Sequence, residues 1–438
     1  MAKFKKNRID IITMGCSKNL VDSEQLIKRL ESIGYNVFHD SDNVIGEIVI
    51  VNTCGFIGDA KEESINMILE LLEAKKEKRI GRVFVMGCLT ERYLSDLKDE
   101  LPDVDRFYGK FDWNQIIELL SKEKQIKCEI NAWERTLTTP PYSAYIKISE
   151  GCNRFCAYCA IPIITGRHKS RPIEEIEAEV KDLVSKGVKE FNIIAQDLSA
   201  YGSDLYGKLM LSELIEKIAQ IEGVEWIRLH YAYPVDFPWE VLDVMNRHDN
   251  VCKYLDIALQ HISDPVLKNM QRRITKVETL EVINRIRRIV PDIKLRTTLM
   301  VGFPGEGEDE FNELIEFVKE IKFDRMGAFA YCEEDDTWAQ KNLEDSIPQE
   351  IKQERLDQLM EIQEEISLSL NTQMIGHNVK VLIDRIEGNE YIGRTQWDSP
   401  EVDPEIHIPI DDTDYSEGDF INVTLTKAYP YELEGKIC

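Results

Sequence analysis

The segment SEGCNRFCAYCAIP, residues 149–162, holds three of the ten cysteines of the chain within eight positions. Cys152, Cys156 and Cys159 have the spacing C-x3-C-x2-C, and they directly follow an apolar run with the pattern of a β-strand. A disulfide knot, a zinc site and chance are three ordinary explanations for such a group. The rest of the sequence decides among them.

Composition argues against the disulfide knot. The chain has 438 residues, of which 43% are hydrophobic and 31% charged, and this length predicts about two to four domains. Ten cysteines spread over so long a chain indicate thiols in a reducing compartment. Residues 1–8 are basic but lead into no apolar run of the signal-peptide type, and no segment has the ~18 apolar residues that span a membrane. We therefore expect a cytoplasmic protein with no membrane partner.

The net charge of the chain bears on its partners. It is −26 at pH 7, and the isoelectric point is near 4.8. Proteins whose main task is to bind phosphate backbones usually present a basic face, because Lys and Arg displace counterions. The acidic balance therefore favours a basic protein partner over bulk nucleic acid.

The first segment, residues 9–120, alternates apolar runs with amphipathic helical patterns, which predicts βαβ units around a parallel sheet. Three of the predicted strands end at cysteines: Cys16, Cys54 and Cys88. Ligands of such sheets bind outside the carboxyl ends of the strands. A buried core cysteine is expected within a strand instead. Three cysteines delivered to one edge therefore favour a metal centre.

The central segment contains six further β-like runs, and each of the first five precedes a helical pattern. Six strand–helix units predict a parallel barrel, or an open part of one, with its chemistry at the carboxyl ends of the strands. The residues after about 374 change to short strands separated by turn residues, which predicts a small all-β barrel or sandwich. This segment has five Lys or Arg and fourteen Asp or Glu between residues 375 and 438, a net charge of −9.

These patterns give an α/β protein with three domains. We predict a three-layer βαβ domain, a Pro-Pro-terminated linker, a partial (β/α)6 barrel with a long trailing helix, and a small all-β domain. The expected boundaries are residues 5–125, 126–141, 142–373 and 374–438.

The cysteine spacing at residues 152–159 is unlike that of a zinc site. Zinc usually takes a fourth protein ligand at a regular spacing, and His168, nine residues beyond Cys159, fits no such pattern. A three-thiolate loop better suits a [4Fe–4S] cluster in which one iron has no protein ligand. An open iron binds a substrate or cofactor, so this loop predicts a site for chemistry.

At this point the sequence resembles a known superfamily. The cysteine loop and the six predicted strands are similar to those of radical S-adenosylmethionine (SAM) enzymes. The resemblance implies that SAM binds the open iron and that its reductive cleavage gives a 5′-deoxyadenosyl radical, which abstracts hydrogen from a C–H bond. The cofactor supplies the radical chemistry, and the protein supplies orientation and exclusion of water.

Over the whole chain, the sequence resembles one family within this superfamily. The motifs GCSKNLVDSE, VNTCGF and MGCL, the radical SAM core and the C-terminal β-domain together resemble the methylthiotransferase family. The resemblance implies that Cys16, Cys54 and Cys88 hold a second [4Fe–4S] cluster, which carries the sulfur to be inserted, and that the C-terminal unit is a substrate-recognising TRAM domain. It also implies an external electron donor and a sulfur source.

Members of this family divide by acceptor, which is either an adenosine of tRNA or an aspartate in the twelfth protein of the small ribosomal subunit. RLHYAYP (228–234), YLDIALQHISDPVLKNMQRR (254–273) and GRTQWDSPEVD (393–403) resemble the ribosomal-protein group. An acidic C-terminal domain also favours a basic ribosomal protein, free or within the ribosome, over tRNA. The expected product is 3-methylthioaspartate. A tRNA adenosine methylthiotransferase is the alternative, and a non-catalytic metal- or RNA-binding module is the alternative from another class.

Candidate SAM contacts follow the second and fifth strands of the predicted barrel. Gln196 and Asp197 end the run IIAQD, where they either reach SAM or form a turn and a helix cap. VGFPGEGEDEF, residues 301–311, is Gly-rich but lacks the Lys-Ser/Thr of a phosphate loop. The resemblance implies that Gly302 and Gly305 allow close approach of the backbone to the adenosyl group. No catalytic side chain is assigned from the sequence.

Overall fold

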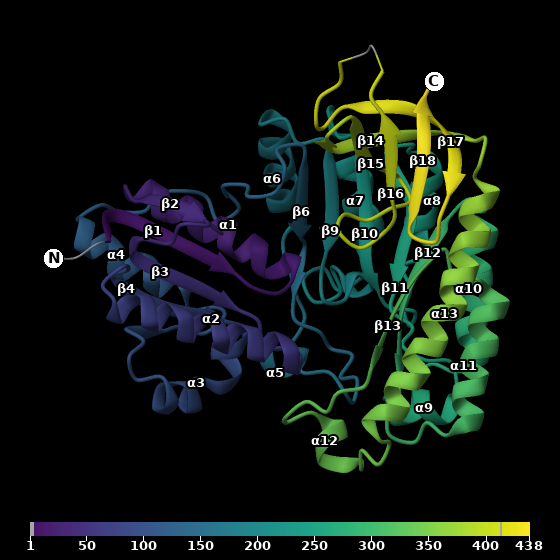
Figure 1. Cartoon of the computed structure of the whole chain (residues 1–438), viewed down its shortest axis with the longest axis horizontal. Coiled ribbons are helices and arrows are strands. Elements are labelled where there is room, and N and C mark those ends of the chain that lie inside the picture. The colour runs from purple at the N-terminus through teal and green to yellow at the C-terminus, as the bar shows by residue number, and fades with distance from the viewer. Residues whose placement is uncertain (1–3, 412–413) are drawn as a thin grey trace.

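The computed structural model describes residues 4–411 and 414–438. Its N-terminal domain is a parallel sheet in the order β2-β1-β3-β4-β5, with two helices on each face (Figure 1). The strands are β1 (Lys5–Thr13), β2 (Asn36–His39), β3 (Gly46–Thr53), β4 (Arg82–Gly87) and β5 (Arg106–Phe107). The helices are α1 (Ser17–Ser32), α2 (Gly58–Lys76), α3 (Cys88–Glu100) and α4 (Trp113–Lys124).

Two apolar layers hold this domain together. Ile9, Ile11 and Ile50 of the sheet pack with α1 and α4, whereas Val49 and Val51 pack with α2 and α3. Successive residues of β3 thus enter opposite layers, as the alternation of a strand requires, and both faces of the parallel sheet are covered. The predicted three-layer domain is confirmed.

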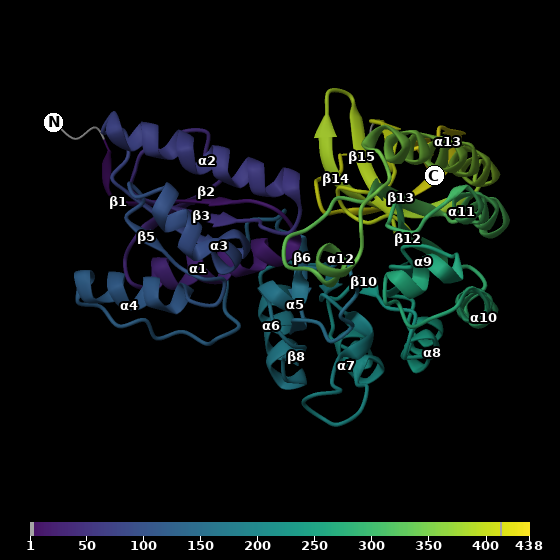
Figure 2. The same ribbon diagram turned by 90° about the horizontal axis from the view of Figure 1, so that it is seen from below.

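The central domain is a sheet of six parallel strands in the order β13-β12-β11-β10-β9-β6. The strands are β6 (Ser143–Lys147), β9 (Glu190–Ile194), β10 (Trp226–Ala232), β11 (Val251–Ile257), β12 (Lys294–Val301) and β13 (Arg325–Ala330). The helices that follow them include α6 (Ile173–Ser185), α7 (Leu211–Ala219), α8 (Glu240–Arg247), α9 (Asp264–Asn269), α10 (Lys276–Ile289), α11 (Glu308–Ile321) and the long α13 (Gln349–Gln373). The sheet curves without closing, so the predicted partial barrel is confirmed (Figures 1 and 2).

The two faces of this sheet differ in polarity. Residues such as Ile193, Leu229 and Leu255 face the helices and form the largest apolar core. Alternate residues on the concave face are mostly polar or charged: Tyr145, Lys147, Asn192, Arg228, His230, Tyr254, Asp256 and Arg296. A buried polar face is costly unless its groups are paired or used, so the concave face is where a functional site is expected.

The C-terminal domain is a closed barrel in the order β14-β15-β16-β18-β17. Its strands are β14 (Asn378–Glu387), β15 (Glu390–Thr395), β16 (Glu405–Pro409), β17 (Phe420–Ala428) and β18 (Glu432–Ile437). The closed barrel decides between the two predicted architectures. The last strand, β18, was not among the predicted strands, because its sequence ELEGKI alternates only weakly and contains a glycine.

This barrel is joined to the central sheet through buried charges. Arg394 of β15 donates to both carboxylate oxygens of Glu190 in β9, at 3.1 and 3.0 Å, and to Asp384, at 2.7 and 2.8 Å. The same Glu190 accepts from Arg228 at 2.5 Å. Trp226 and Phe420 stack edge to face beside this group, with their ring centroids 4.8 Å apart.

The N-terminal domain is attached at two places. In the linker, Arg135 pairs with Glu24 of α1 at 2.5 Å and with Glu179 of α6 at 2.9 Å. After β13, Glu334 pairs with Lys61 of α2 and Arg92 of α3, each at 3.0 Å. Figure 2 shows the segment after β13 reaching the edge of the N-terminal domain that faces the barrel and then turning back to the short helix α12 (Trp338–Asn342).

No helix within residues 4–411 or 414–438 has both the length and the hydropathy needed to cross a membrane.

The Arg394–Glu190 contact predicts a large effect on stability. Replacing Arg394 with Met leaves Asp384 without its cation and leaves Glu190 with only one of its two arginine partners. Removal of one partner of a buried ion pair costs about 3 kcal/mol or more. We expect the free energy of unfolding to fall by that amount in a denaturant titration followed by tryptophan fluorescence.

Arg385→Met is the matched control, because Arg385 is 39% exposed and pairs with Glu405 at the surface. Its replacement is expected to change the free energy of unfolding by less than about 1 kcal/mol. Equal effects of the two substitutions would contradict the role given to the buried contact.

Candidate active site

The first cysteine trio lies at the carboxyl edge of the N-terminal sheet. Cys16 precedes α1, Cys54 follows β3, and Cys88 is the first residue of α3. A Cβ atom added to Gly15 would lie 2.9 Å from the Cys54 sulfur, and one added to Gly55 would lie 2.5 Å from Leu89 Cα. The three cysteine loops therefore meet at distances that only glycine permits.

Asn19 of α1 ties these loops together. Its side-chain amide donates to the carbonyl oxygens of Met14 and Thr53, at 3.0 and 3.1 Å. Its side-chain oxygen lies 3.6 Å from the sulfur of Cys88. One buried side chain thus contacts all three loops that carry the trio.

The second trio lies in a loop closed by a short hairpin, β7 (Ser149–Glu150) with β8 (Lys169–Ser170). The backbone N–H of Cys159 donates to the carbonyl of Cys156 at 3.0 Å, and the N–H of Ala157 donates to Met270 at 2.9 Å. Phe155, between the first two cysteines, has a φ of 53°, so the loop turns through the left-handed region. The loop is compact and anchored to the barrel.

Burial opposes ionisation of most of these thiols. It raises the pKa of Cys88 and of Cys152 to about 12, and it also raises the pKa of Cys159. Neighbouring cysteines in the same trio raise these pKa values further. Such thiols become thiolates only beside a strong positive charge, as when they bind a metal centre. All ten cysteines are free thiols.

Two sets of three thiols match the donor set of [4Fe–4S] clusters with one open iron. No three His, Cys, Asp or Glu side chains in the described residues are grouped closely enough to hold a single metal ion. A four-iron cluster binds each cysteine through a different iron, so its ligands are farther apart than those of one ion.

Cations surround the second trio. Arg272 is buried and donates to the sulfur of Cys156 at 3.3 Å and to the hydroxyl of Tyr158 at 3.3 Å. The guanidinium groups of Arg272 and Arg154 lie 4.2 and 4.4 Å from the ring centroid of Tyr233. These cations favour anionic groups at the cysteine loop. The sequence patterns gave no indication of Arg272, which lies 113 positions beyond Cys159 and reaches the loop only in the folded barrel.

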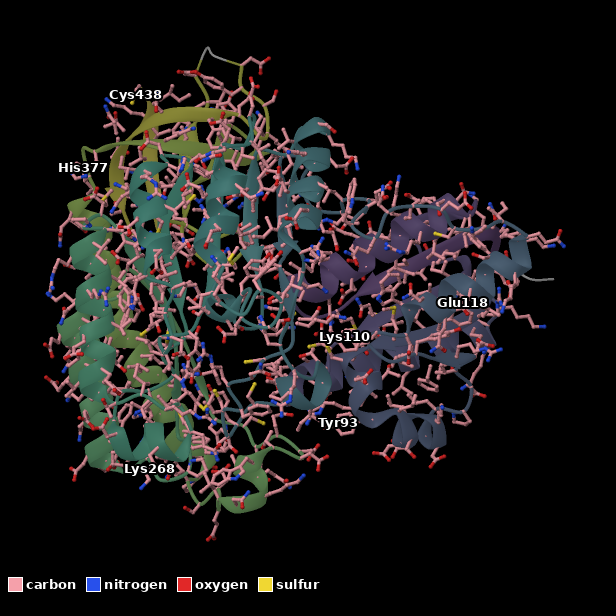
Figure 3. All side chains as sticks on the ribbon, turned by 180° about the vertical axis from the view of Figure 1, so that it is seen from behind. Tyr93, Lys110, Glu118, Lys268, His377 and Cys438 are labelled. Atoms are coloured by element: carbon pink, nitrogen blue, oxygen red, sulfur yellow. The ribbon has the colours of Figure 1, made fainter. Side chains whose placement is uncertain are left out.

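Four charged side chains connect the two trios, and we call them the interdomain bridge: Asp22, Lys110 and Lys147, which are buried, and Glu150, which is 20% exposed. Lys110 donates to Asp22 at 2.8 Å and lies 4.0 Å from Glu150, while Lys147 contacts both acids. Burial alone would raise the pKa of Glu150, but Lys147 and Lys110 lower it to about 2. Figure 3 places Lys110 at the side of the N-terminal domain that faces the barrel. The bridge joins α1, behind Cys16, to the hairpin that precedes Cys152.

The structure places the two polar candidates after β9 in different surroundings. Gln196 donates to Glu150 at 2.8 Å, and its side-chain oxygen is buried without a hydrogen-bond partner in the described residues. Asp197 accepts from Arg154 at 2.6 Å and from the N–H of Ser199 at 3.1 Å, which caps the short 3-10 helix after it. Gln196 thus keeps an acceptor for a ligand, whereas Asp197 caps a helix and holds Arg154. Their assignment as SAM contacts stays a prediction.

Gly302 and Gly305 have φ angles of 72° and 95° and pack tightly. A Cβ atom at Gly302 would lie 2.4 Å from Lys352 Cγ, and one at Gly305 would lie 2.5 Å from Asn269 Nδ2. Contacts within the protein therefore already require glycine at both positions, and their approach to SAM stays a prediction. The N–H of Gly302 also donates to Glu306, which lies 3.1 Å from the Nε2 of His261.

Residues of all three domains line one cavity. It has a volume of about 210 Å³ and opens on the concave face of the barrel. Gly15, Cys16 and Ser17 line it from the N-terminal domain, and residues 399–402 line it from the C-terminal segment. The barrel contributes Tyr145, Ile194, His230, Tyr231, Tyr254, Asp256 and Arg296. Burial and the neighbouring Arg228 lower the pKa of His230, so its imidazole is neutral at pH 7. Through Cys16 the cavity reaches the first trio.

Family models match the chain in three segments. The Uncharacterized protein family UPF0004 matches residues 8–109, the Radical SAM superfamily matches residues 146–318, and the TRAM domain matches residues 375–438. The three segments follow the order of the three structural units, and the middle one ends before β13 and α13.

Solved structures share the fold at low identity. TsrM from Kitasatospora setae, a radical SAM methyltransferase with cobalamin and a [4Fe–4S] cluster bound, aligns with a TM-score of 0.56 and 13% identity, over 74% of this chain and 75% of that one. OxsB, a cobalamin-dependent SAM radical enzyme, aligns with a TM-score of 0.51 and 12% identity, over 82% of this chain and 56% of that one.

Curated relatives match over the full length. The ribosomal protein uS12 methylthiotransferase RimO of Phocaeicola vulgatus is 61% identical over 99% of this chain and 100% of its own length. The protein of the same name from Bacteroides thetaiotaomicron is 60% identical over 99% of each chain, and that of Christiangramia forsetii is 50% identical over 99% of this chain and 95% of its own. At this identity and coverage, with both cysteine trios placed as described, the chain belongs to the radical SAM methylthiotransferases of the RimO type.

Proposed function

We propose that this protein transfers a methylthio group to the β-carbon of an aspartate in ribosomal protein uS12, giving 3-methylthioaspartate. The choice of acceptor is supported by full-length identity of about 60% to uS12 methylthiotransferases, and the location of the reaction is supported by the cavity that Cys16 lines. An acidic C-terminal domain of net charge −9 opposes the alternative, a tRNA adenosine acceptor, because it repels phosphate.

The enzyme uses SAM and two [4Fe–4S] clusters. Cys152, Cys156 and Cys159 would hold the SAM-binding cluster, and Cys16, Cys54 and Cys88 would hold the second one. When bound, these groups supply hydrogen abstraction from carbon and the methylthio sulfur. The free acceptor of Gln196 supports a place for the amino group of SAM near the second trio.

The side chains of the protein position the two centres, supply positive charge and limit the access of water. Arg272 and Arg154 place positive charge at the loop of Cys156, which favours the carboxylate of SAM and the anionic cluster. The interdomain bridge fixes the loop of Cys152 relative to α1 and Cys16. The concave face and residues 399–402 enclose the substrate side chain and limit the access of water.

The partners follow from the same arrangement. Glu401 is exposed at the mouth of the cavity on the acidic C-terminal side, where it suits a basic ribosomal protein, free or in the assembled subunit. An external reductant and a sulfur source complete the reaction. Because the acceptor belongs to the ribosome, the site of action is the cytoplasm.

Iron analysis tests the two ligand sets separately. After anaerobic reconstitution we expect about eight iron atoms in the wild-type protein and about four in each triple Ala variant, one at residues 16, 54 and 88 and the other at residues 152, 156 and 159. Zinc without iron, or loss of all iron in both variants, would contradict two independent clusters.

The acceptor is tested by mass spectrometry of reaction products. Reconstituted wild-type enzyme with SAM, a reductant and a sulfur source should add a methylthio group to an aspartate of uS12 and leave tRNA unmodified. Modification of tRNA instead would reverse the proposed acceptor.

If the interdomain bridge positions the two centres, its disruption should uncouple SAM cleavage from product formation. Lys147→Met leaves Asp22 and Glu150 without one cation, so the two trios lose their fixed separation while their cysteines remain. We expect unchanged iron content and continued SAM cleavage, but a yield of product per SAM cleaved that is lower by about tenfold or more.

Lys380→Met is the control, because Lys380 pairs with Glu225 at the surface and its side chain is 45% exposed. A Lys147→Met enzyme that matches this control in product yield would show that the bridge does not position the two centres.

A further inference from the structure

Arg296 of β12 has an unusual position on the concave face. It lines the cavity shared by the three domains, opposite Cys16 and beside residues 399–402. Its side chain is only 17% exposed. The nearest carboxylate oxygens are Asp403 Oδ1, 3.4 Å from Nε, and Asp256 Oδ1, 3.7 Å from Nη1. Within residues 4–411 and 414–438 its guanidinium donates no hydrogen bond, and Nε is buried without a partner.

The neighbouring guanidinium groups each donate hydrogen bonds, although the Nε of Arg228 is likewise buried without a partner in the described residues. Arg394 makes bidentate contacts to Glu190 and Asp384. Arg228 donates to Glu190 at 2.5 Å and to the carbonyl of Thr395 at 3.1 Å. Arg325 donates to Asp398 at 2.6 and 3.0 Å. A buried cation whose N–H groups are unsatisfied is costly, and native structures keep one chiefly where function requires it. Arg296 is therefore a candidate for binding an external anion.

Of the two neighbouring acids, Asp403 is also held by other groups. Asp403 accepts from the hydroxyl of Tyr254 at 2.9 Å and from the N–H of Ser399 at 2.8 Å, so it holds the segment that closes the cavity. Asp256 stays beyond hydrogen-bonding distance of Arg296. A second cation is close by, because the Nζ of Lys18 lies 3.6 Å from the ring centroid of Tyr231 in the cavity wall. Arg296 and Lys18 offset the two acids, and in the described residues the N–H groups of Arg296 remain without a hydrogen-bond acceptor.

We infer that Arg296 binds the side-chain carboxylate of the substrate aspartate. The inference rests on the proposed function and specifies how its acceptor is held. The fork of a guanidinium takes a carboxylate through two parallel N–H···O bonds, which fix both position and orientation. In aspartate the β-carbon is bonded directly to this carboxylate. Clamping the carboxylate therefore places the reacting carbon in the cavity that Cys16 lines.

Charge then selects the substrate in two steps. The acidic C-terminal domain, with Glu401 at the mouth, attracts the basic protein from outside. Inside, Arg296 selects an acidic side chain, because asparagine offers one acceptor oxygen and no charge. Exchange of Asp for Asn at the target therefore tests this residue specifically.

The experiment measures binding as well as activity. The target aspartate of uS12 is located by mass spectrometry of the wild-type product and replaced with Asn. Dissociation constants of both forms of uS12 are then measured anaerobically with the reconstituted full-length enzyme, without SAM. We expect the wild-type enzyme to prefer the Asp form by roughly tenfold to a hundredfold, and Arg296→Gln to bind both forms equally weakly.

Two further variants make the result decisive. Arg296→Lys keeps the charge but loses the fork, so it should give an intermediate preference, and it also serves if the Gln variant does not fold. Arg82→Gln removes a surface arginine paired with Glu123 and should keep the wild-type preference. Iron content and SAM cleavage without substrate are measured for every variant to show that each is intact.

The possible outcomes distinguish a failure of the role given to Arg296 from a failure of the proposed function. A folded Arg296→Gln enzyme that still prefers the Asp form overturns the role of Arg296, as does a wild-type enzyme that binds both forms equally. A wild-type enzyme that leaves uS12 unmodified overturns the proposed function itself.

Discussion

The interdomain bridge of Asp22, Lys110, Lys147 and Glu150 is the contact on which the relation between the two cysteine trios depends. Two acids and two lysines make it neutral as a whole, and each domain contributes one acid and one lysine, so that docking adds the contacts of Lys147 with Asp22 and of Lys110 with Glu150. Asp22 and Lys110 come from the N-terminal domain, and Lys147 and Glu150 come from the barrel. Isolated buried charges are costly, and a removed partner leaves that cost uncompensated. The bridge therefore favours one docked arrangement over others, and a reaction that uses two centres requires such an arrangement.

The same reasoning explains why the concave face of the barrel is polar. Period-two alternation sends Leu229 and Leu255 into the helical layer, and it sends Arg228, His230 and Asp256 to the other side. In a closed barrel this interior would be filled by apolar side chains. Here the sheet stays open, and its polar face is covered by the other two domains. Arg228 is satisfied by Glu190 and by the carbonyl of Thr395 in β15, so the C-terminal barrel is also part of the wall of the site.

Sequence patterns predicted the fold class well because it follows from local periodicity. The strands before Cys16, Cys54 and Cys88, the six barrel strands and the long helix α13 were all visible as runs of the correct period. The strand β18 was missed because its contacts with β16 and β17 stabilise it more than its own composition does. The six cysteines were visible as candidate ligands from their placement after strands. Lys110, Arg272 and Arg296 were not, since a lone cation has no local signature and gains its meaning from partners distant in the sequence.

Charge acts at two length scales in this protein. At long range, a chain of net charge −26 attracts basic surfaces and repels nucleic acid, and salt screens this field over about 8–10 Å. At short range, the buried cations Lys110 and Arg272 and the half-buried Arg296 lie where the reaction gathers anionic groups, and removal from water weakens the screening of their fields. Net charge alone therefore identifies the kind of partner but conceals the charge of the site. An acidic enzyme can therefore bind acidic ligands where cations such as Lys110 and Arg272 are buried beside the site.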